Sequence, residues 1–325
     1  MSQKKLDLRE ICRDSRAIAI GGHIRPDGDC VGSCLGVMHY LHRLYPDKTV
    51  DVYLEFVPDS LRLLPGWEKI RTAYDPSRTY DTYIALDNGD IDRLGFSKPY
   101  FDAAETKVVI DHHISNTYRG KHVLVVPQAS AASEIVADLI DDEDLTLEIA
   151  QCLYLGIVHD TGVFKHNNTT PHTMCVAGRL IGCGIDTEQI INESFYEKTY
   201  IQNQILGRTL LESFLVFDGK MVVSVIKNQV LTFYGATSQD IDGVIDQLNV
   251  THGIEVAALI YEIEPEEYKI SLRSHHIVDV SKVAKSLGGG GHVHAAGFSA
   301  TGNWHDIVNN IMELVEPELG VASEE

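Results

Sequence analysis

The first half of the chain alternates short apolar runs with longer segments in which apolar residues recur at helical spacing. Runs of this length that end in glycine or in polar residues predict buried strands, and the periodic segments predict helices. We expect strands at 17–22, 51–57, 81–87 and 107–113, and helices at 30–44, 133–141, 147–158 and from 171 onward. Strands that alternate with helices are typical of an open, mainly parallel sheet with helices on both faces, which is the α/β fold class that we expect.

The pattern changes in the second half of the chain, after a long polar segment at 192–214 that predicts a helix between two domains. The apolar runs beyond it predict strands at 221–226, 254–264 and 268–274, followed by a helix near 280–287. A length of 325 residues also fits two domains, since single domains usually have about 100–200 residues. We therefore expect a catalytic domain at 1–190, a helical linker at 191–214 and a smaller α/β domain at 215–325.

Three of the expected strands lead into side chains that bind metals. His23 follows the strand at 17–22, Asp87 ends the strand at 81–87, and the Asp111-His112-His113 triplet ends the strand at 107–113. In an open α/β sheet, ligands bind beyond the carboxyl ends of the strands. These side chains are therefore expected to converge on one site.

Further donors come from the loop HIRPDGD and from the segment GIVHDTG. The loop adds Asp27 and Asp29, and the second segment adds Asp160. The whole set supplies imidazoles and carboxylates but no thiolates, which suits Mn²⁺ or Mg²⁺ and argues against a structural zinc site. Each piece alone is weak, because an HxxxDxD loop is more often a solvated turn and a strand-end aspartate is more often a cap. Their joint occurrence at strand ends favours a two-metal hydrolase, in which a carboxylate bridges two ions about 3.5–4 Å apart.

The formal net charge of −20 argues against a protein that tracks long nucleic acid, which usually carries a basic stripe. An acidic protein binds a small phosphate compound where cations and a few basic groups supply local positive charge. No stretch approaches the roughly 20 apolar residues of a membrane span, and the polar start predicts no signal peptide. The six cysteines form no CxxC pair, so we expect inert thiols, Cys30 and Cys34 included, and a cytoplasmic location.

The segments HIRPDGD, LDNGD, IDHH and VHDTG resemble the four motifs of the DHH phosphoesterases, a family named after the triplet found here at 111–113. SLRS at 271–274 and GGGGHVHAAG at 288–297 resemble the DHH-associated C-terminal substrate domain. The resemblance extends from about residue 15 to about residue 315 and keeps the motifs in order. It implies a DHH catalytic domain followed by a substrate-binding domain.

The resemblance also implies a role for each matching residue. His23, Asp27 and Asp87 would hold one metal ion, and the other would be held by Asp29, Asp87, His112 and Asp160, with Asp87 bridging. His113 would face the substrate phosphate, and Asp111 would orient the histidines, as carboxylate partners of imidazoles do. The expected catalytic residues are therefore His113, Asp87 and Asp111.

In the second domain the resemblance implies substrate contacts from Arg273 and from Gly289, Gly290, Gly291 and His292. Arginine contacts phosphate with two donors, and glycines admit the positive φ angles of anion-binding backbone. Two residues depart from the family pattern: His159 stands where a smaller side chain is expected, and His294 stands where a polar non-histidine residue is more familiar. Their roles are left open.

The function implied is hydrolysis of short oligonucleotides to mononucleotides and of 3′-phosphoadenosine 5′-phosphate (pAp) to AMP, with two divalent ions, preferably Mn²⁺, as cofactors. The alternative is a phosphodiesterase for cyclic di-AMP or its linear product pApA, which the same fold and metals would serve. A single-strand exonuclease is disfavoured because it would need more positive charge. A nucleotide sensor with a dead site is disfavoured because every matched metal ligand is present. A homodimer is left open.

Overall fold

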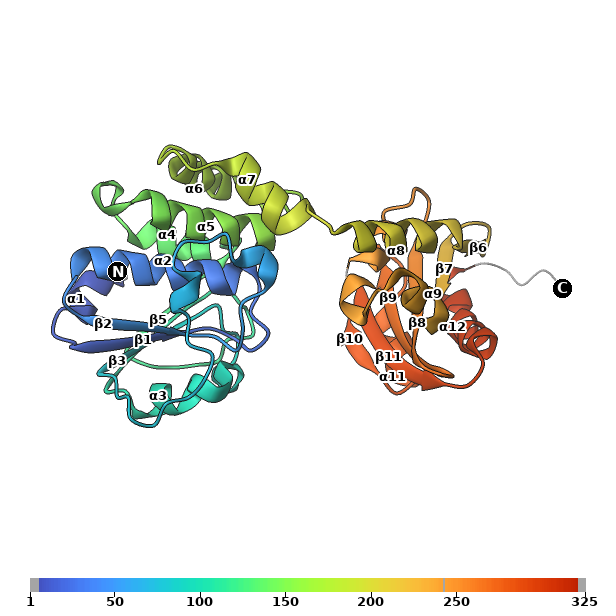
Figure 1. Ribbon diagram of the computed structural model, residues 1–325, viewed down its shortest axis with the longest axis horizontal. Helices are drawn as coiled ribbons and strands as arrows, with labels where there is room; N and C mark the ends of the chain where they lie inside the picture. Colours follow the sequence, from blue (N-terminus) through green and yellow to red (C-terminus); the bar gives the residue numbers. More distant parts are fainter. Residues whose placement is uncertain (1–5, 242, 321–325) are drawn as a thin grey trace. The chain divides into compact units, whose positions relative to one another are not determined.

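Five strands at the centre of the N-terminal unit form an all-parallel sheet in the order β2-β1-β3-β4-β5 (Figure 1). They are β1 (Ala17–Gly21), β2 (Thr49–Tyr53), β3 (Thr82–Leu86), β4 (Thr106–Asp111) and β5 (His122–Val125). Every residue of β3 is buried, as expected for a strand covered on both faces of a parallel sheet. The coordinates come from a computed structural model that describes residues 6–241 and 243–320.

Helices cover both faces of this sheet, which confirms the predicted fold class. One core joins one face of the sheet, including Ile18 and Ile84, to helices of the unit, whereas Tyr83 on the opposite face packs with Tyr100 and Phe101. The first face carries α2 (Gly28–Leu44) and α4 (Ala132–Leu139), on which α5 (Leu147–Asp160) packs, and the second carries α3 (Lys98–Ala103) (Figure 1). The remaining helices of the unit are α1 (Leu8–Cys12), α6 (Pro171–Ile181) and α7 (Thr187–Ile191).

The strand order brings the predicted metal-binding side chains to one edge of the sheet. Between β1 and β3 the chain reverses its direction of travel across the sheet, and such a switch point is where open α/β sheets bind ligands. His23 lies just beyond β1, Asp87 directly follows β3, and Asp111 is the last residue of β4. Because β1, β3 and β4 are neighbours with the same direction, these three positions lie side by side at one sheet edge.

The C-terminal unit is built on a six-stranded mixed sheet in the order β10-β11-β9-β8-β7-β6, in which β7 and β8 pair in parallel. Its strands are β6 (Phe214–Val216), β7 (Met221–Ile226), β8 (Val256–Glu264), β9 (Glu267–Ser274), β10 (Gly290–His292) and β11 (Ala295–Thr301). One face packs against α8 (Tyr200–Leu211), α9 (Asn228–Tyr234) and α10 (Val244–Asn249), and the other against α11 (Val280–Ser286) and α12 (Trp304–Leu319). This unit is therefore α/β as well.

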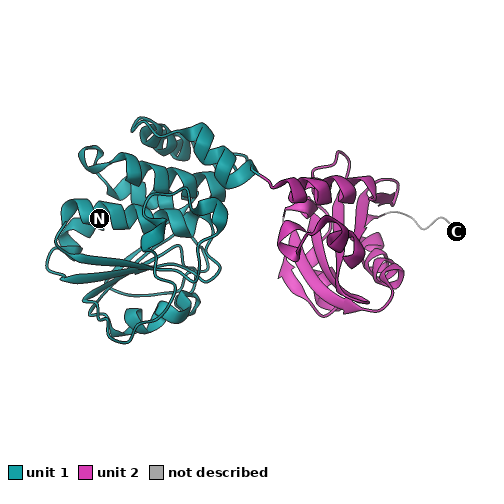
Figure 2. Cartoon of the chain, in the orientation of Figure 1, with its two compact units in different colours: residues 1–197 teal, residues 198–325 magenta. Residues whose placement is uncertain are grey.

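The structure divides the chain into residues 1–197 and 198–325 (Figure 2). The segment predicted as a helical linker, 191–214, comprises the end of α7, a π-helical turn at Asn192–Tyr196, α8 and the first residue of β6. The domain limits 1–190, 191–214 and 215–325 stay predictions. Within the described ranges, none of the helices is both long and apolar enough to cross a membrane.

One strand prediction needs correction, and one strand was not predicted. The strand expected at 51–57 begins and ends earlier, as β2, because its parallel pairing with β1 stops at Gly21. Gly290 and Gly291 lie in β10, which forms a hairpin with β11, and their assignment to substrate stays a prediction. No apolar periodicity marks this strand, since it exists through pairing with its neighbour.

Candidate metal centre

Asp87 lies at the centre of the cluster of acidic and histidine side chains. It is 2% exposed and has φ of 49°, a left-handed conformation that aspartate and asparagine adopt more readily than most residues. Its Oδ2 lies 3.4 Å from Nε2 of His23, and its Oδ1 lies 3.4 Å from Nε2 of His112. The two oxygens of one carboxylate therefore face two different imidazoles.

His23 and Asp27 meet on one side of Asp87. The Nδ1 atom of His23 lies 2.8 Å from the carbonyl oxygen of Ile24, to which it donates, so Nε2 is the nitrogen that faces the carboxylates. Nε2 lies 3.6 Å from Oδ2 of Asp27. Asp27 is the N-cap of α2 and uses its other oxygen, Oδ1, to accept from the backbone N–H groups of Asp29 and Cys30. The helix cap thus orients Oδ2 toward the histidine.

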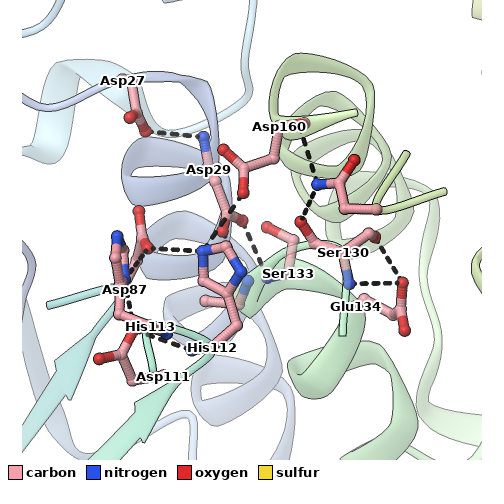
Figure 3. Close-up of polar contacts among 12 residues, drawn as sticks. Asp27, Asp29, Asp87, Asp111, His112, His113, Ser130, Ser133, Glu134 and Asp160 are labelled. Atoms are coloured by element: carbon pink, nitrogen blue, oxygen red, sulfur yellow. Dashed lines mark hydrogen bonds and ion pairs between the residues drawn. The ribbon is translucent and has the colours of Figure 1, made fainter. Parts of the chain in front are cut away.

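On the other side of Asp87, His112 meets two carboxylates from different helices. Its Nε2 lies 3.2 Å from Oδ2 of Asp160, which is the last residue of α5. One donor atom from each of His112, Asp160 and Asp29 lies within 4.8 Å of the others (Figure 3). Asp29 is fully buried and accepts the backbone N–H groups of Ala132 at 2.5 Å and Ser133 at 2.9 Å, in the first turn of α4. The helix N-terminus stabilises this buried negative charge.

The pKa shifts within the cluster indicate an excess of negative charge. Burial, together with Asp87 and Asp160, raises the pKa of Asp29 well above its ordinary value. Burial also raises the pKa of Asp160 to about 7, against the attraction of His112. Burial alone would lower the pKa of the two imidazoles, but the neighbouring carboxylates outweigh it and raise the pKa of His23 to about 11 and that of His112 to about 10. Added positive charge is therefore favoured here.

The donor set and its spacing fit divalent cations. The separations of 3.2–3.6 Å between imidazole nitrogens and carboxylate oxygens exceed an ordinary hydrogen bond. Two donors that share one ion at about 2.1 Å lie roughly 3.0–3.4 Å apart, so these separations suit a shared ion better. Oδ1 of Asp87 is buried and has no hydrogen-bond partner among the described residues, which leaves it available as a ligand.

Asp111 and His113 form a separate pair beside Asp87. Oδ1 of Asp111 accepts from Nδ1 of His113 at 2.8 Å and from the backbone N–H of His112 at 2.8 Å (Figure 3). The hydrogen bond that His113 donates to Asp111 outweighs burial and raises the pKa of His113. Nδ1 of His113 also lies 3.5 Å from Oδ1 of Asp87. The ring of His113 is thus oriented by Asp111, whereas His112 meets Asp111 only through its backbone.

Sequence reasoning missed the amides that hold the acidic residues in place. Asn116 is buried and donates from Nδ2 to Oδ2 of Asp111 at 2.6 Å. Asn168 donates from Nδ2 to the carbonyl oxygens of Ser130 at 3.0 Å and Asp160 at 3.1 Å. Both lie in loops, where an asparagine is an ordinary turn residue, so no sequence signal separated them from their neighbours.

Asn168→Ala removes the two hydrogen bonds that tie the end of α5 to the segment before α4. We expect the Mn²⁺ affinity and the hydrolytic rate to fall by roughly 10–100-fold, the usual cost of losing an outer partner of a metal ligand. Calorimetric Mn²⁺ titration and a hydrolysis assay measure both quantities. The exposed neighbour Asn167, changed to alanine, is the matched control. Wild-type affinity and rate in Asn168→Ala would contradict the positioning role.

Two of the predicted substrate residues of the C-terminal unit, Arg273 and His292, lie on one face of its sheet. Arg273 in β9 is directly opposite Ala295 in β11, and Ala295 is directly opposite His292 in β10. Residues directly opposite in an antiparallel sheet share a face, so Arg273 and His292 flank a small alanine. Nε of Arg273 lies 3.1 Å from Oδ1 of Asp246, a partner that the sequence did not indicate.

The structural reason for a glycine differs among Gly289, Gly290 and Gly291. A Cβ atom at Gly289 would lie 2.2 Å from the carbonyl oxygen of Gly297, and one at Gly291 would lie 2.5 Å from that of Ala295. Close packing inside the unit therefore explains these two. A Cβ at Gly290 would meet nothing within 4 Å, so packing does not explain this one.

The two histidines whose roles were left open have structural partners. His159 lies against Gly28, where a Cβ atom would approach its ring to 2.2 Å, and its ring contacts that of Phe195 with centroids 5.6 Å apart. Burial lowers the pKa of His159. Nδ1 of His294 lies 3.1 Å from Oγ of Ser274.

Comparison with known proteins gives matches over both units. Residues 17–157 match the DHH family, N-terminal domain, and residues 218–317 match the DHHA1 domain. The chain is 30% identical to the bifunctional oligoribonuclease and PAP phosphatase NrnA of Thermus thermophilus, over 93% of this chain and 90% of the relative. It is 27% identical to the cyclic-di-AMP phosphodiesterase PdeA of Listeria monocytogenes, over 89% of this chain but 45% of the relative. An exopolyphosphatase-related protein from Bacteroides fragilis has a similar structure, with a TM-score of 0.83 at 25% identity, covering 95% of this chain and 94% of that one.

Proposed function

Since this chain belongs to the DHH family, we propose that it is a two-metal phosphoesterase that hydrolyses short oligonucleotides to mononucleotides and pAp to AMP. Membership of this family makes it a metal-dependent hydrolase. The number and identity of the cations, the residues of the site and the substrates are part of the proposal.

The observation that carries the proposal is the position of Asp87. Its two oxygens face His23 and His112 separately, with His112 also close to Asp160. A carboxylate that presents one oxygen to each of two donor groups has the arrangement of a bridging ligand in a two-metal site. This supports one cation among His23, Asp27 and Asp87, and a second among Asp29, Asp87, His112 and Asp160.

Two divalent cations at these positions would lower the pKa of a water molecule between them and polarise the phosphoryl oxygens. The protein groups around the cations would keep the metal ligands in position and neutralise negative charge on the substrate. Asp29 is fixed by the N–H groups of α4, so its carboxylate cannot turn away from the cluster. The hydrogen bond to Asp111 holds His113 through Nδ1 and raises its pKa, which favours a protonated ring whose Nε2 donates to a phosphoryl oxygen, where negative charge develops.

The comparisons support a short substrate. The Thermus relative, named as an oligoribonuclease and PAP phosphatase, matches over nearly its whole length, whereas this chain spans less than half of the cyclic-di-AMP phosphodiesterase PdeA. The net charge of −20 also disfavours a long strand, which would require a basic track. Arg273 and His292, on one face of the second sheet, are the groups that we assign to substrate phosphate. The similarity to PdeA keeps cyclic di-AMP and pApA as the second candidate.

Mn²⁺ is the proposed cation because the donors are carboxylates and imidazoles, which suit Mn²⁺ and Mg²⁺. We also retain the cytoplasm as the proposed location, with no membrane partner. A homodimer stays an open expectation.

Hydrolysis by the metal-free protein, before and after addition of Mn²⁺, tests the function. The substrates are a dinucleotide, an RNA of about 20 nucleotides, pAp and cyclic di-AMP, each at the same concentration. We expect Mn²⁺-dependent turnover, fastest on the dinucleotide or pAp and slow on the long RNA. Faster opening of cyclic di-AMP would favour the second candidate, and no metal-dependent turnover of any of them by the folded protein would refute the proposal.

A further inference from the structure

Cys30 is a buried thiol inside the proposed metal centre. It lies in the first turn of α2, directly after Asp29, and its side chain is 0% exposed. Its Sγ atom, one nitrogen of His23 and one carboxylate oxygen of Asp87 all lie within 4.8 Å of one another. These three groups come from three segments: α2, the loop after β1 and the position that follows β3.

The surroundings leave room for the thiol, whose side-chain neighbours include the thiol of Cys34. A Cβ atom at Gly22 would lie 2.2 Å from Sγ of Cys30, so the glycine after β1 provides the space that the thiol fills. The hydrogen bond of this thiol, to the carbonyl oxygen of His23, is long at 3.9 Å. Asp87, 2% exposed, directs its Oδ2 to the same side, at 3.4 Å from Nε2 of His23.

We propose that Cys30 is a sulfur ligand for the cation held by His23 and Asp87. This inference rests on the metal centre of the proposed function and changes its chemistry. A site with nitrogen, oxygen and sulfur donors favours softer divalent cations such as Co²⁺, Zn²⁺ and Cd²⁺ over Mn²⁺ and Mg²⁺. Cysteine binds a metal as the thiolate, so its proton is released to solvent when the cation enters. The two cation positions would then differ, because Asp29, His112 and Asp160 supply only oxygen and nitrogen.

The ordinary explanation is that Cys30 is a small apolar residue in the core, as free buried cysteines usually are. The chain offers a matched control for that explanation. Cys34 lies one turn further along α2, is also 0% exposed and also faces Gly22, at 3.5 Å from a Cβ built there. It belongs to none of the metal-binding groups found among the described residues. A packing role predicts similar behaviour for the two thiols, whereas a ligand role predicts a difference.

The test is titration of the metal-free protein with Co²⁺, followed by absorption spectroscopy. We expect a sulfur-to-cobalt charge-transfer band in the near ultraviolet for the wild type and for Cys34→Ser. Cys30→Ser should still bind Co²⁺ in equilibrium dialysis but lack the band. In competition between Cd²⁺ and Mn²⁺, the preference for Cd²⁺ should fall by at least about tenfold in Cys30→Ser. Losing even an outer partner of a metal ligand costs at least about this much in affinity.

Wild-type protein that binds Co²⁺ without the band would overturn the role of Cys30 and leave the metal centre standing. The same conclusion follows if Cys30→Ser keeps the band. Protein that binds no Co²⁺ at all would overturn both the sulfur ligand and the metal centre. The wild-type spectrum decides the matter even if Cys30→Ser does not fold.

Discussion

Asp87→Asn is expected to reduce metal-dependent hydrolysis by roughly 10³-fold or more. Asparagine keeps the size of the side chain and tolerates the φ of 49°, so the backbone after β3 should keep its conformation. The change removes the negative charge that faces both His23 and His112. Metal ions contribute several kcal/mol of charge stabilisation in the transition state, and about 4 kcal/mol corresponds to roughly 10³-fold in rate. Dinucleotide hydrolysis and the stoichiometry of Mn²⁺ binding by calorimetry measure the effect.

Asp90→Asn is the control for this change. Asp90 is three positions further along the same loop, is exposed, and accepts from the backbone N–H of Asp92 at 3.0 Å, which asparagine does equally well. It should retain wild-type activity and Mn²⁺ binding. If Asp87→Asn, folded by circular dichroism, turns over substrate like Asp90→Asn, Asp87 does not hold the cations.

His113→Gln is expected to lower kcat by roughly 10²–10³-fold while Mn²⁺ binding stays close to that of the wild type. This is the usual cost of losing one donor to the charge that develops in a transition state. Nδ1 of His113 is committed to Asp111, and the resulting rise in its pKa favours the protonated ring, in which Nε2 is a donor. The ring is also the more accessible of the triplet, since its side chain is 36% exposed against 16% for His112.

Comparison of the loss in kcat with the loss in Mn²⁺ affinity tests the role assigned to His113. Its Nδ1 also lies 3.5 Å from Oδ1 of Asp87, so a metal-binding role is the competing explanation. If His113→Gln weakens Mn²⁺ binding as much as it slows hydrolysis, His113 is a metal ligand and the assignment to phosphate is wrong. His172→Gln, an exposed histidine paired with Asp138, should change neither quantity.

Apolar runs, and charged residues at their ends, were the local patterns from which strands and site residues could be predicted. β3 is buried along its whole length and apolar after Thr82, because both faces of a parallel strand are covered, so its position and the Asp87 that follows it could be predicted. The position of β10 could not be predicted, because a glycine-rich edge strand has no periodicity and forms only by pairing with β11. The polar segment at 192–214 hid a change from α7 to a π-helical turn and then α8, since periodicity does not reveal helix breaks without glycine or proline.

By itself, the sequence determined the α/β class and the set of strand-end residues that converge, because burial patterns and strand direction are properties of each segment and its neighbours. Only the tertiary structure decided which oxygen of Asp87 faces which imidazole, that Asp29 lies on the N-terminus of α4, and that Asn168 holds the carbonyl of Asp160. It also brought Cys30, expected to be inert, within reach of His23 and Asp87. These contacts join segments from different parts of the chain, and their distances of a few ångströms depend on how helices pack on the sheet, which no local pattern encodes.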